Sequence, residues 1–175
     1  GYEVSTRIGV AVQPAHYRFF HTTGTVGCFG AAAAGAALLA PESARAGAHA
    51  LATSATFASG LQQAFRSDAM TKALHAGHEA WVGVTAAQGA ASGVTGVMDI
   101  LEGEFGFGAA LGKDPAWAKE TDGLGQRFNI QSMTLKSHGC CGHTFAAIDA
   151  VLALRAAHGI AADAIEAIAV ATYGP

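Results

Sequence analysis

Three short clusters of the sequence combine His or Lys with Gly and with small hydroxyl or thiol side chains. They are "HTTGTVG" at 21–27, "TKALHAGHEA" at 71–80 and "LKSHGCCGHT" at 135–144, and each lies just ahead of a predicted helix or at its start. Imidazole titrates near neutrality, and ammonium groups attract anions. If the clusters converge, they form a pocket suited to a small di- or tricarboxylate.

The first cluster places His21, Thr23, Gly24 and Thr25 at the start of an apolar helix. The N-terminus of a helix has unpaired N–H groups and a partial positive charge, so it can bind a carboxylate. The simpler alternative is that Thr23 or Thr25 caps the helix and that His21 is an ordinary loop histidine. The glycines do not form G-x-G-x-x-G and no P-loop lysine follows, which argues against nucleotide binding.

In the second cluster, Lys72 and His75 are three residues apart. This spacing places both side chains on one face of a helix or in the loop that leads into it. In either place they offer a cation and a titratable base to one ligand. The alternative is a solvated surface lysine beside a half-buried histidine.

The third cluster contains Lys136, His138, Cys140, Cys141 and His143, a composition that invites a zinc interpretation. Structural zinc sites use separated pairs of ligands, whereas adjacent cysteines project in different directions, so we predict no metal site. A Gly-rich turn that exposes Lys136 near the N-terminus of the next helix fits the sequence better, and such a position again favours anions.

The apolar spacing predicts the helices that carry these clusters. They are expected over residues 3–13, from 23–25 to 39, and over 43–61, 75–91 and 144–157, with a short helical piece at 97–103. Ser43 is the predicted cap of the third helix, and Ser67 or Asp68 that of the fourth. Most apolar positions are Ala or Gly, which lets helix backbones approach closely, so we expect a tightly packed bundle.

A loop-rich stretch at 103–131 separates this bundle, residues 1–131, from a second region, residues 132–175. The segment 164–173, "AIEAIAVATY", has the composition of a strand, but a lone strand is not stable by itself. The fold class is therefore expected to be mainly α, with a helical domain followed by the beginning of a second, smaller domain.

Composition narrows the choice of partners and compartment. A hydrophobic fraction of 51% with 13% charged residues is typical of a folded globular domain. The net charge of -3 and the scattered Lys and Arg argue against nucleic acid and anionic membranes. The apolar run at 22–39 is short and rich in Ala and Gly, so we do not expect it to span a bilayer. Three cysteines without a C-x-x-C pair favour the reducing cytoplasm.

Five linked motifs resemble the MmgE/PrpD family, which includes 2-methylcitrate dehydratase, cis-aconitate decarboxylase and iminodisuccinate epimerase. They are "GYEVSTRIG", "FHTTGTVGCFGAAAAGAALL", "MTKALHAGHEAWVGVTAAQGAASG", "ILEGEFGF" and "LKSHGCCGHTFAAIDAVLAL". The resemblance covers nearly the whole chain and is weakest at 113–127. It implies a helical domain joined to a smaller α/β lid, with the active site between the two domains. It also implies a homodimer that acts on small polycarboxylates without a metal or organic cofactor.

The same motifs imply roles for individual residues. His21, Lys72 and Lys136 are expected to be catalytic, and Thr23, Gly24, Thr25, His75 and His143 are expected to bind substrate. Members of the family are more than twice as long as this chain. Their upstream segment, with an Asp and another His of the active site, has no counterpart in it. We therefore expect the chain to be an internal piece of such an enzyme and inactive alone.

The family's reactions move a proton on carbon next to a carboxylate. Ammonium groups stabilise the resulting carbanion or enediolate, and a histidine serves as base or acid. With the same groups, the intermediate can lose water, lose carbon dioxide or be reprotonated with inversion of a stereocentre. We expect a 2-methylcitrate dehydratase-like lyase; the alternatives are an epimerase, an isomerase or a decarboxylase of this family, or a noncatalytic helical interaction module.

Overall fold

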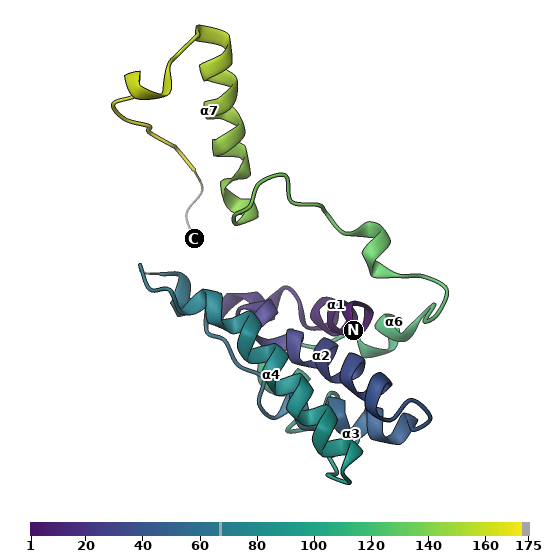
Figure 1. Cartoon of the computed structure of the whole chain (residues 1–175). Helices are drawn as coiled ribbons and strands as arrows, with labels where there is room; N and C mark the ends of the chain where they lie inside the picture. Colours follow the sequence, from purple (N-terminus) through teal and green to yellow (C-terminus); the bar gives the residue numbers. More distant parts are fainter. Residues whose placement is uncertain (67, 173–175) are drawn as a thin grey trace. The chain divides into compact units, whose positions relative to one another are not determined.

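The computed structural model describes residues 1–66 and 68–172, and it divides the chain into two compact units, Gly1–Ser132 and Met133–Pro175. Figure 1 shows the helices of both units. The first unit contains α1 (Tyr2–Val12), α2 (Thr22–Leu39), α3 (Ala44–Ala55), α4 (Thr71–Ala91), α5 (Phe107–Leu111) and α6 (Trp117–Thr121). It also contains 3-10 turns at Ala15–Arg18, Gln62–Phe65 and Asn129–Ser132.

The second unit contains one long helix, α7 (Phe145–His158), with 3-10 turns at Gly142–Thr144 and Ala162–Ala164. Helix α7 ends at Gly159, whose φ of 61° is left-handed, a conformation that glycine adopts at low cost. No strand is found in the described part of the chain, and the prediction of a mainly α fold with a helical bundle is confirmed. The α/β character of a lid domain stays a prediction.

The α2 and α4 helices form the centre of the first unit, where they lie side by side (Figure 1). Small residues allow this close approach: a Cβ atom on Gly83 would lie 2.5 Å from the backbone oxygen of Cys28. Ala32, Ala36 and Ala87 are buried along the same contact. At one end the interface continues into a larger apolar cluster around Val12, Phe29, Val82 and Phe107.

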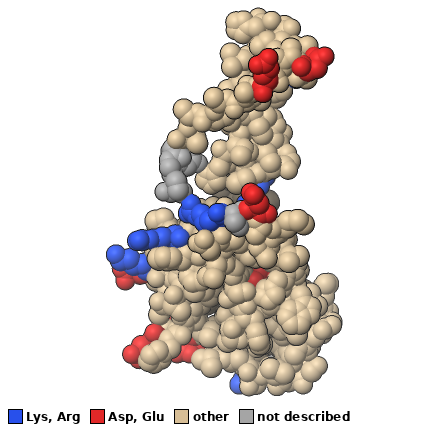
Figure 2. All heavy atoms as spheres, turned by 90° about the vertical axis from the view of Figure 1, so that its left-hand side faces the viewer, with Lys and Arg blue, Asp and Glu red and all other residues tan. Residues whose placement is uncertain are grey.

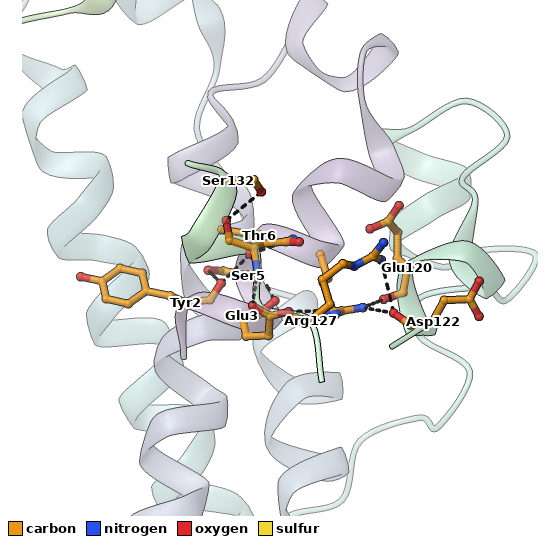
Figure 3. Close-up of polar contacts among 10 residues, drawn as sticks. Tyr2, Glu3, Ser5, Thr6, Glu120, Asp122, Arg127 and Ser132 are labelled. Atoms are coloured by element: carbon orange, nitrogen blue, oxygen red, sulfur yellow. Dashed lines mark hydrogen bonds and ion pairs between the residues drawn. The ribbon is translucent and has the colours of Figure 1, made fainter. Parts of the chain in front are cut away.

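Polar contacts attach α1 to the segment that follows α6 (Figure 3). The buried guanidinium of Arg7 donates to Glu3 at 2.6 Å and to the backbone oxygens of Glu120, Asp122 and Arg127. Its hydrogen bond to Glu3 is the main reason why the pKa of that carboxyl lies below its ordinary value. One buried arginine thus fixes one carbonyl group of α6 and two of the following loop, which has little regular structure of its own.

Two predicted helix boundaries are wrong. The third helix ends at Ala55, because the chain turns at Gly60, whose φ of 135° is outside the helical range. The fourth helix begins at Thr71, one turn earlier than predicted, since the sequence "TKAL" contains no residue that breaks a helix.

The caps follow the predictions only at α3. Ser43 caps that helix by accepting a hydrogen bond from the Ala46 N–H. The N-cap of α4 is Met70 rather than Asp68, and Ser67 lies outside the described residues. The threonines do not cap α2, whose N-cap is His21. The Thr25 hydroxyl instead donates back to the carbonyls of preceding residues.

Two smaller elements also differ from the predictions. Residues 97–103 form turns rather than a helical piece, closed by a hydrogen bond from the Gly103 N–H to the Asp99 oxygen. Within 164–173, the described residues up to 172 form no strand, because no neighbouring strand accepts their hydrogen bonds in the described part of the chain.

The α2 helix is long and apolar enough to cross a membrane, by length and composition only. A core helix of a soluble protein passes the same test. In this structure α2 packs against α1, α3 and α4, and eight of its residues are buried. Its hydropathy is therefore explained by its place at the centre of the bundle.

Candidate active site

A short backbone contact fixes His21 at the N-terminus of α2. The His21 N–H donates to the Gly60 oxygen at 2.8 Å, and the Gln62 N–H donates to the Phe19 oxygen at 2.9 Å. Phe20 and Leu61 form an antiparallel bridge between these bonds. We call residues 59–62 the brace, because this segment holds the N-terminal end of α2 in place.

The side chains of His21 and His75 contact each other directly. Their Nδ1 atoms are 2.9 Å apart, and their ring centroids are separated by 5.1 Å. One Nδ1 must donate while the other accepts, so the contact holds one proton and excludes a second. His75 reaches this position because α4 begins at Thr71 and carries His75 in its second turn, facing α2.

Lys72 lies beside the histidine pair, and Phe65 connects them. The Lys72 ammonium is 4.2 Å from the centroid of the Phe65 ring, within the range of a cation–π interaction. The edge of the same ring contacts His21, with centroids 4.8 Å apart. Lys72 and His21 are both partly exposed, so a ligand from solvent can reach them.

The surroundings of His21 disfavour its cationic form. Desolvation, followed by the nearby His75 and Lys72, lowers the pKa of His21 from 6.5 to about 4. His21 is therefore neutral at physiological pH and keeps a lone pair on one ring nitrogen. The site thus combines a neutral base with an adjacent ammonium cation.

Two glycines make the histidine contact possible. A Cβ atom on Gly24 would lie 2.9 Å from the Ser59 oxygen and 3.2 Å from Nδ1 of His75. Gly60 has φ 135°, and a Cβ there would lie 3.3 Å from the same nitrogen. Gly24 is buried, so its role in this structure is to admit the brace and the His75 ring.

The two threonines of the first cluster lie in different environments. Thr23 is exposed in the first turn of α2. Thr25 is fully buried, and its hydroxyl lies 2.7 Å from Nε2 of His16. The other nitrogen of His16, Nδ1, lies 2.8 Å from the Leu111 oxygen. Thr25 therefore faces the core, whereas Thr23 is accessible to a ligand.

The third cluster belongs to the second unit. Lys136 is exposed and donates to the Cys140 oxygen at 3.1 Å, and His143 is exposed in the turn ahead of α7. Nε2 of His138 lies 2.7 Å from Oδ1 of Asp149. All three cysteines of the chain are free thiols. An open, largely apolar groove separates α7 from residues 165–172.

Among the described residues, no group of three His, Cys, Asp or Glu side chains is arranged to hold a metal ion. In the first unit, the charged and titratable groups near the N-terminus of α2 include His21, Lys72 and His75, with a buried Glu79 on the next turn of α4. This set can bind an anion and move a proton.

The sequence interpretation missed three contributors to the site. Residues 59–61 of the brace lie within the predicted third helix, and Phe65 lies outside every predicted element. Glu79 was not singled out, although it is seven residues after Lys72 and four after His75. A carboxylate on the face that those two residues share is the signal that would have found it.

Comparison with known proteins identifies the family of the chain. The profile of the MmgE/PrpD N-terminal domain matches residues 1–120, which contain His21, Lys72 and His75. A search among curated proteins found no significant match. Because the matched region covers most of the 175 residues, the chain belongs to the MmgE/PrpD family.

Proposed function

We propose that the chain supplies part of the active site of an enzyme that moves a proton next to a carboxylate on a small di- or tricarboxylate. The observation that carries this proposal is the direct contact between His21 and His75 with Lys72 beside it. A neutral imidazole and an ammonium group at the start of a long helix suit proton abstraction from an anionic substrate.

Substrate binding would activate the base. Lys72 and the N–H groups of the first turn of α2, where Thr23 is exposed, would bind a carboxylate. Desolvation, followed by the effects of His75 and Lys72, keeps the pKa of His21 low in the free protein, and the negative charge of the ligand opposes the effects of these two residues. The pKa of His21 then rises toward neutrality, where a general base is most effective.

Lys72 has a second role in the proposed reaction. When the proton leaves carbon, negative charge moves onto the adjacent carboxylate to form an enediolate. An ammonium group already bound to that carboxylate stabilises the new charge more than the original one, which lowers the barrier. Lys136 and His143, which belong to the second unit, are also proposed as a catalytic and a substrate-binding residue of the enzyme.

A 2-methylcitrate dehydratase-like lyase is the proposed reaction type, in which the carbanion expels water. Epimerisation and decarboxylation use the same first intermediate, so they remain alternatives within the proposal. No metal or organic cofactor is proposed. The cytoplasm is the proposed location, and the free thiols support it. Nucleic acid is not a proposed partner, and most of the face shown in Figure 2 is uncharged.

A second copy of the chain is the proposed protein partner. Met70 at the N-cap of α4 and Leu74 and Trp81 on the helix are exposed at spacings of four and seven residues, and Trp81 is 64% exposed. A Cβ atom on Gly77, on the same face, would meet nothing within 4 Å. In a two-fold pair of antiparallel α4 helices, each Trp81 can pack over the Gly77 of its partner, so the face is complementary to itself.

Ligand binding tests the enzyme proposal against a noncatalytic helical module. Citrate, 2-methylcitrate, cis-aconitate and aspartate-derived dicarboxylates are added one at a time to the complete protein, and its melting temperature is measured. A binder raises the melting temperature with ligand concentration, because stability gains RT ln(1 + [L]/Kd). Lys72→Ala should remove that rise. The absence of any shift across the series would favour the module.

A further inference from the structure

His16 is a buried titratable group that the proposed chemistry does not use. It lies in the 3-10 turn between α1 and α2 and is 1% exposed. Both nitrogens of its ring have partners: Nδ1 lies 2.8 Å from the Leu111 oxygen, and Nε2 lies 2.7 Å from Oγ1 of Thr25. Leu111 is the last residue of α5, and Thr25 belongs to the first turn of α2. His16 therefore joins the ends of two helices through two short hydrogen bonds inside the core.

The partners of His16 determine its tautomer. The Leu111 oxygen is a carbonyl and can only accept, so Nδ1 of His16 must carry a proton. Burial lowers the pKa of His16, so the ring is neutral near pH 7 and Nε2 keeps a lone pair. Nε2 therefore accepts a hydrogen bond from the Thr25 hydroxyl. His16 is thus a neutral bridge that donates to α5 and accepts from α2.

Two contacts connect His16 to His21. The Thr25 hydroxyl, which donates to His16, also lies 3.4 Å from the backbone oxygen of His21, one turn earlier. The His16 ring stacks on Phe20, the residue before His21, with centroids 5.2 Å apart and an angle of 22° between the rings. The backbone of His21 is therefore held through Phe20 and Thr25, in addition to the hydrogen bond that its N–H donates to Gly60.

The N-terminus of α2 depends on such contacts because it has no side-chain cap. Its N-cap is His21, whose side chain makes no capping hydrogen bond. Helix ends without a cap lose stability and fray. The contact between His21 and His75 lies at this end, and its two Nδ1 atoms are only 2.9 Å apart. Small movements of the first turn would therefore lengthen or break it.

We propose that His16 is a positioning residue of the candidate site: as the Nδ1–H tautomer it joins the Leu111 carbonyl to the Thr25 hydroxyl and so fixes the first turn of α2, which holds His21 against His75. Its expected effect on turnover rests on the proposed function of the histidine pair. Its effect on the geometry of that pair does not, and the two can be measured separately.

Three variants of the complete protein separate positioning from stability. His16→Phe keeps an aromatic ring against Phe20 but removes both hydrogen bonds. His16→Gln offers one N–H donor and one carbonyl acceptor in place of the two ring nitrogens, so it should restore the bridge. His49→Phe, at another buried histidine of the same unit, is the matched control, because His49 lies on α3 and its Nδ1 contacts the backbone of Gly96. Both Phe variants should lower the melting temperature, since each leaves buried backbone groups unpaired.

The readouts are turnover and the pH titration of His21, followed by NMR with labelled histidine. In His16→Phe we expect kcat to fall about tenfold to 100-fold and the pKa of His21 to move from about 4 toward 6.5. In His16→Gln and in His49→Phe, kcat should stay within about threefold and the titration should not move. The positioning role is wrong if His16→Phe changes neither readout, if His16→Gln behaves like His16→Phe, or if both readouts simply follow the melting temperature across the three variants.

A spectrum of the unaltered protein covers the case in which His16→Phe does not fold. Protonated and unprotonated ring nitrogens have different ¹⁵N shifts, so labelled histidine reports the tautomer directly. At pH 7 the ring of His16 should carry its proton on Nδ1 and none on Nε2. A proton on Nε2 would overturn the inference. If the His21 titration responds to His16→Phe but the wild type turns over no carboxylic acid, the positioning role stands and the proposed function fails.

Discussion

The contact between the two Nδ1 atoms of His21 and His75 determines the protonation states that the site can adopt. The atoms are 2.9 Å apart, so protonating both would place two N–H groups against each other. The nearby Lys72 is a cation, and an anion that binds beside it would stabilise the ammonium group and the protonated form of His21. This arrangement supports the proposal that the site binds a carboxylate.

The low pKa of His21 predicts a loss of stability in acid. Its folded pKa of about 4 lies below the ordinary 6.5. The unfolded chain thus binds a proton that the folded chain disfavours. The stability that the neutral form of His21 contributes is fully present above pH 6.5 and is lost as the pH falls toward 4. Because His21 is partly exposed, we expect roughly 1–2 kcal/mol.

Urea unfolding of the wild type and of His21→Gln, measured from pH 7 to pH 4, checks this prediction. Glu79, whose pKa is raised, gains stability in acid and acts in the opposite direction, but it does so in both proteins. The difference between the two curves therefore isolates His21. A difference that stays constant across this pH range would contradict the pKa of about 4.

Lys72 should matter for turnover and little for stability. Lys72→Ala removes the ammonium group that is proposed to stabilise the enediolate, so we expect kcat to fall by about 10² to 10³ in the complete protein. Its cation–π contact with Phe65 is partly exposed, and the melting temperature should change by only a few degrees. Lys119→Ala, at an exposed position of α6, is the control. Wild-type activity in Lys72→Ala would remove this lysine from the mechanism.

At the scale of elements, the contact between α2 and α4 sets the position of His75. Gly77 and Gly83 lie on the same helix, but a Cβ on Gly83 would lie 2.4 Å from Cβ of Ala31, whereas one on Gly77 would meet nothing within 4 Å. Gly83→Ala should therefore lower stability by about 1–3 kcal/mol, and Gly77→Ala should raise it by about 0.5–1 kcal/mol. Chemical unfolding of both variants measures the two changes in the free energy of unfolding. Equal effects would mean that α2 and α4 do not pack this closely.

The buried Arg7 should be among the most sensitive positions of the first unit. Arg7→Met removes the guanidinium that donates to Glu3 and to the backbone oxygens of Glu120, Asp122 and Arg127. We expect a loss of about 3–5 kcal/mol in the free energy of unfolding. Arg18→Met, at an exposed position, should change it by less than about 0.5 kcal/mol. A small effect of Arg7→Met would show that α1 and the segment after α6 are joined by other contacts.

The sequence predicted the helices whose apolar faces are continuous and failed where tertiary contacts decide the boundary. The α1, α2 and α7 helices lie within about a residue of their predicted bounds. Helix α3 ends early because the brace must reach the N-terminus of α2, a contact between residues about 40 positions apart. Local propensity contains no information about such a pairing.

At the scale of the whole chain, the two units differ in their burial. None of the described residues from 133 to 172 is buried, whereas α2 alone buries eight. Amide hydrogens of α7 should therefore exchange roughly 100-fold or more faster than those of the centre of α2. Hydrogen exchange followed by mass spectrometry of this chain measures both. Equal protection would mean that α7 packs against a surface that this structure does not contain.

The proposed homodimer has its own test. Trp81→Glu places a charge on the exposed face of α4, so sedimentation velocity should show a shift from dimer to monomer, whereas Glu104→Gln should leave the mass unchanged. A wild-type monomer at all concentrations would contradict the dimer. A dimer that persists in Trp81→Glu would place its interface elsewhere.

The candidate site was predictable in its residue types but not in its assembly. His21, Lys72 and His75 were expected from their clusters, and the structure brings them together. Gly24 of α2 and Gly60 of the brace matter through approaches of about 3 Å, which no single segment of sequence specifies. Phe65 could not be assigned for the same reason, since its role depends on contacts with two elements.

The central claim is that His21, His75 and Lys72 move a proton next to a carboxylate. The most direct test is proton NMR of the complete protein in D2O with citrate, 2-methylcitrate, cis-aconitate or an aspartate-derived dicarboxylate. We predict deuterium incorporation next to a carboxylate of at least one acid, with or without new vinyl signals, and its loss in Lys72→Ala. A folded wild type that incorporates no deuterium into any of them, or a Lys72→Ala variant that exchanges as fast as wild type, would contradict the claim.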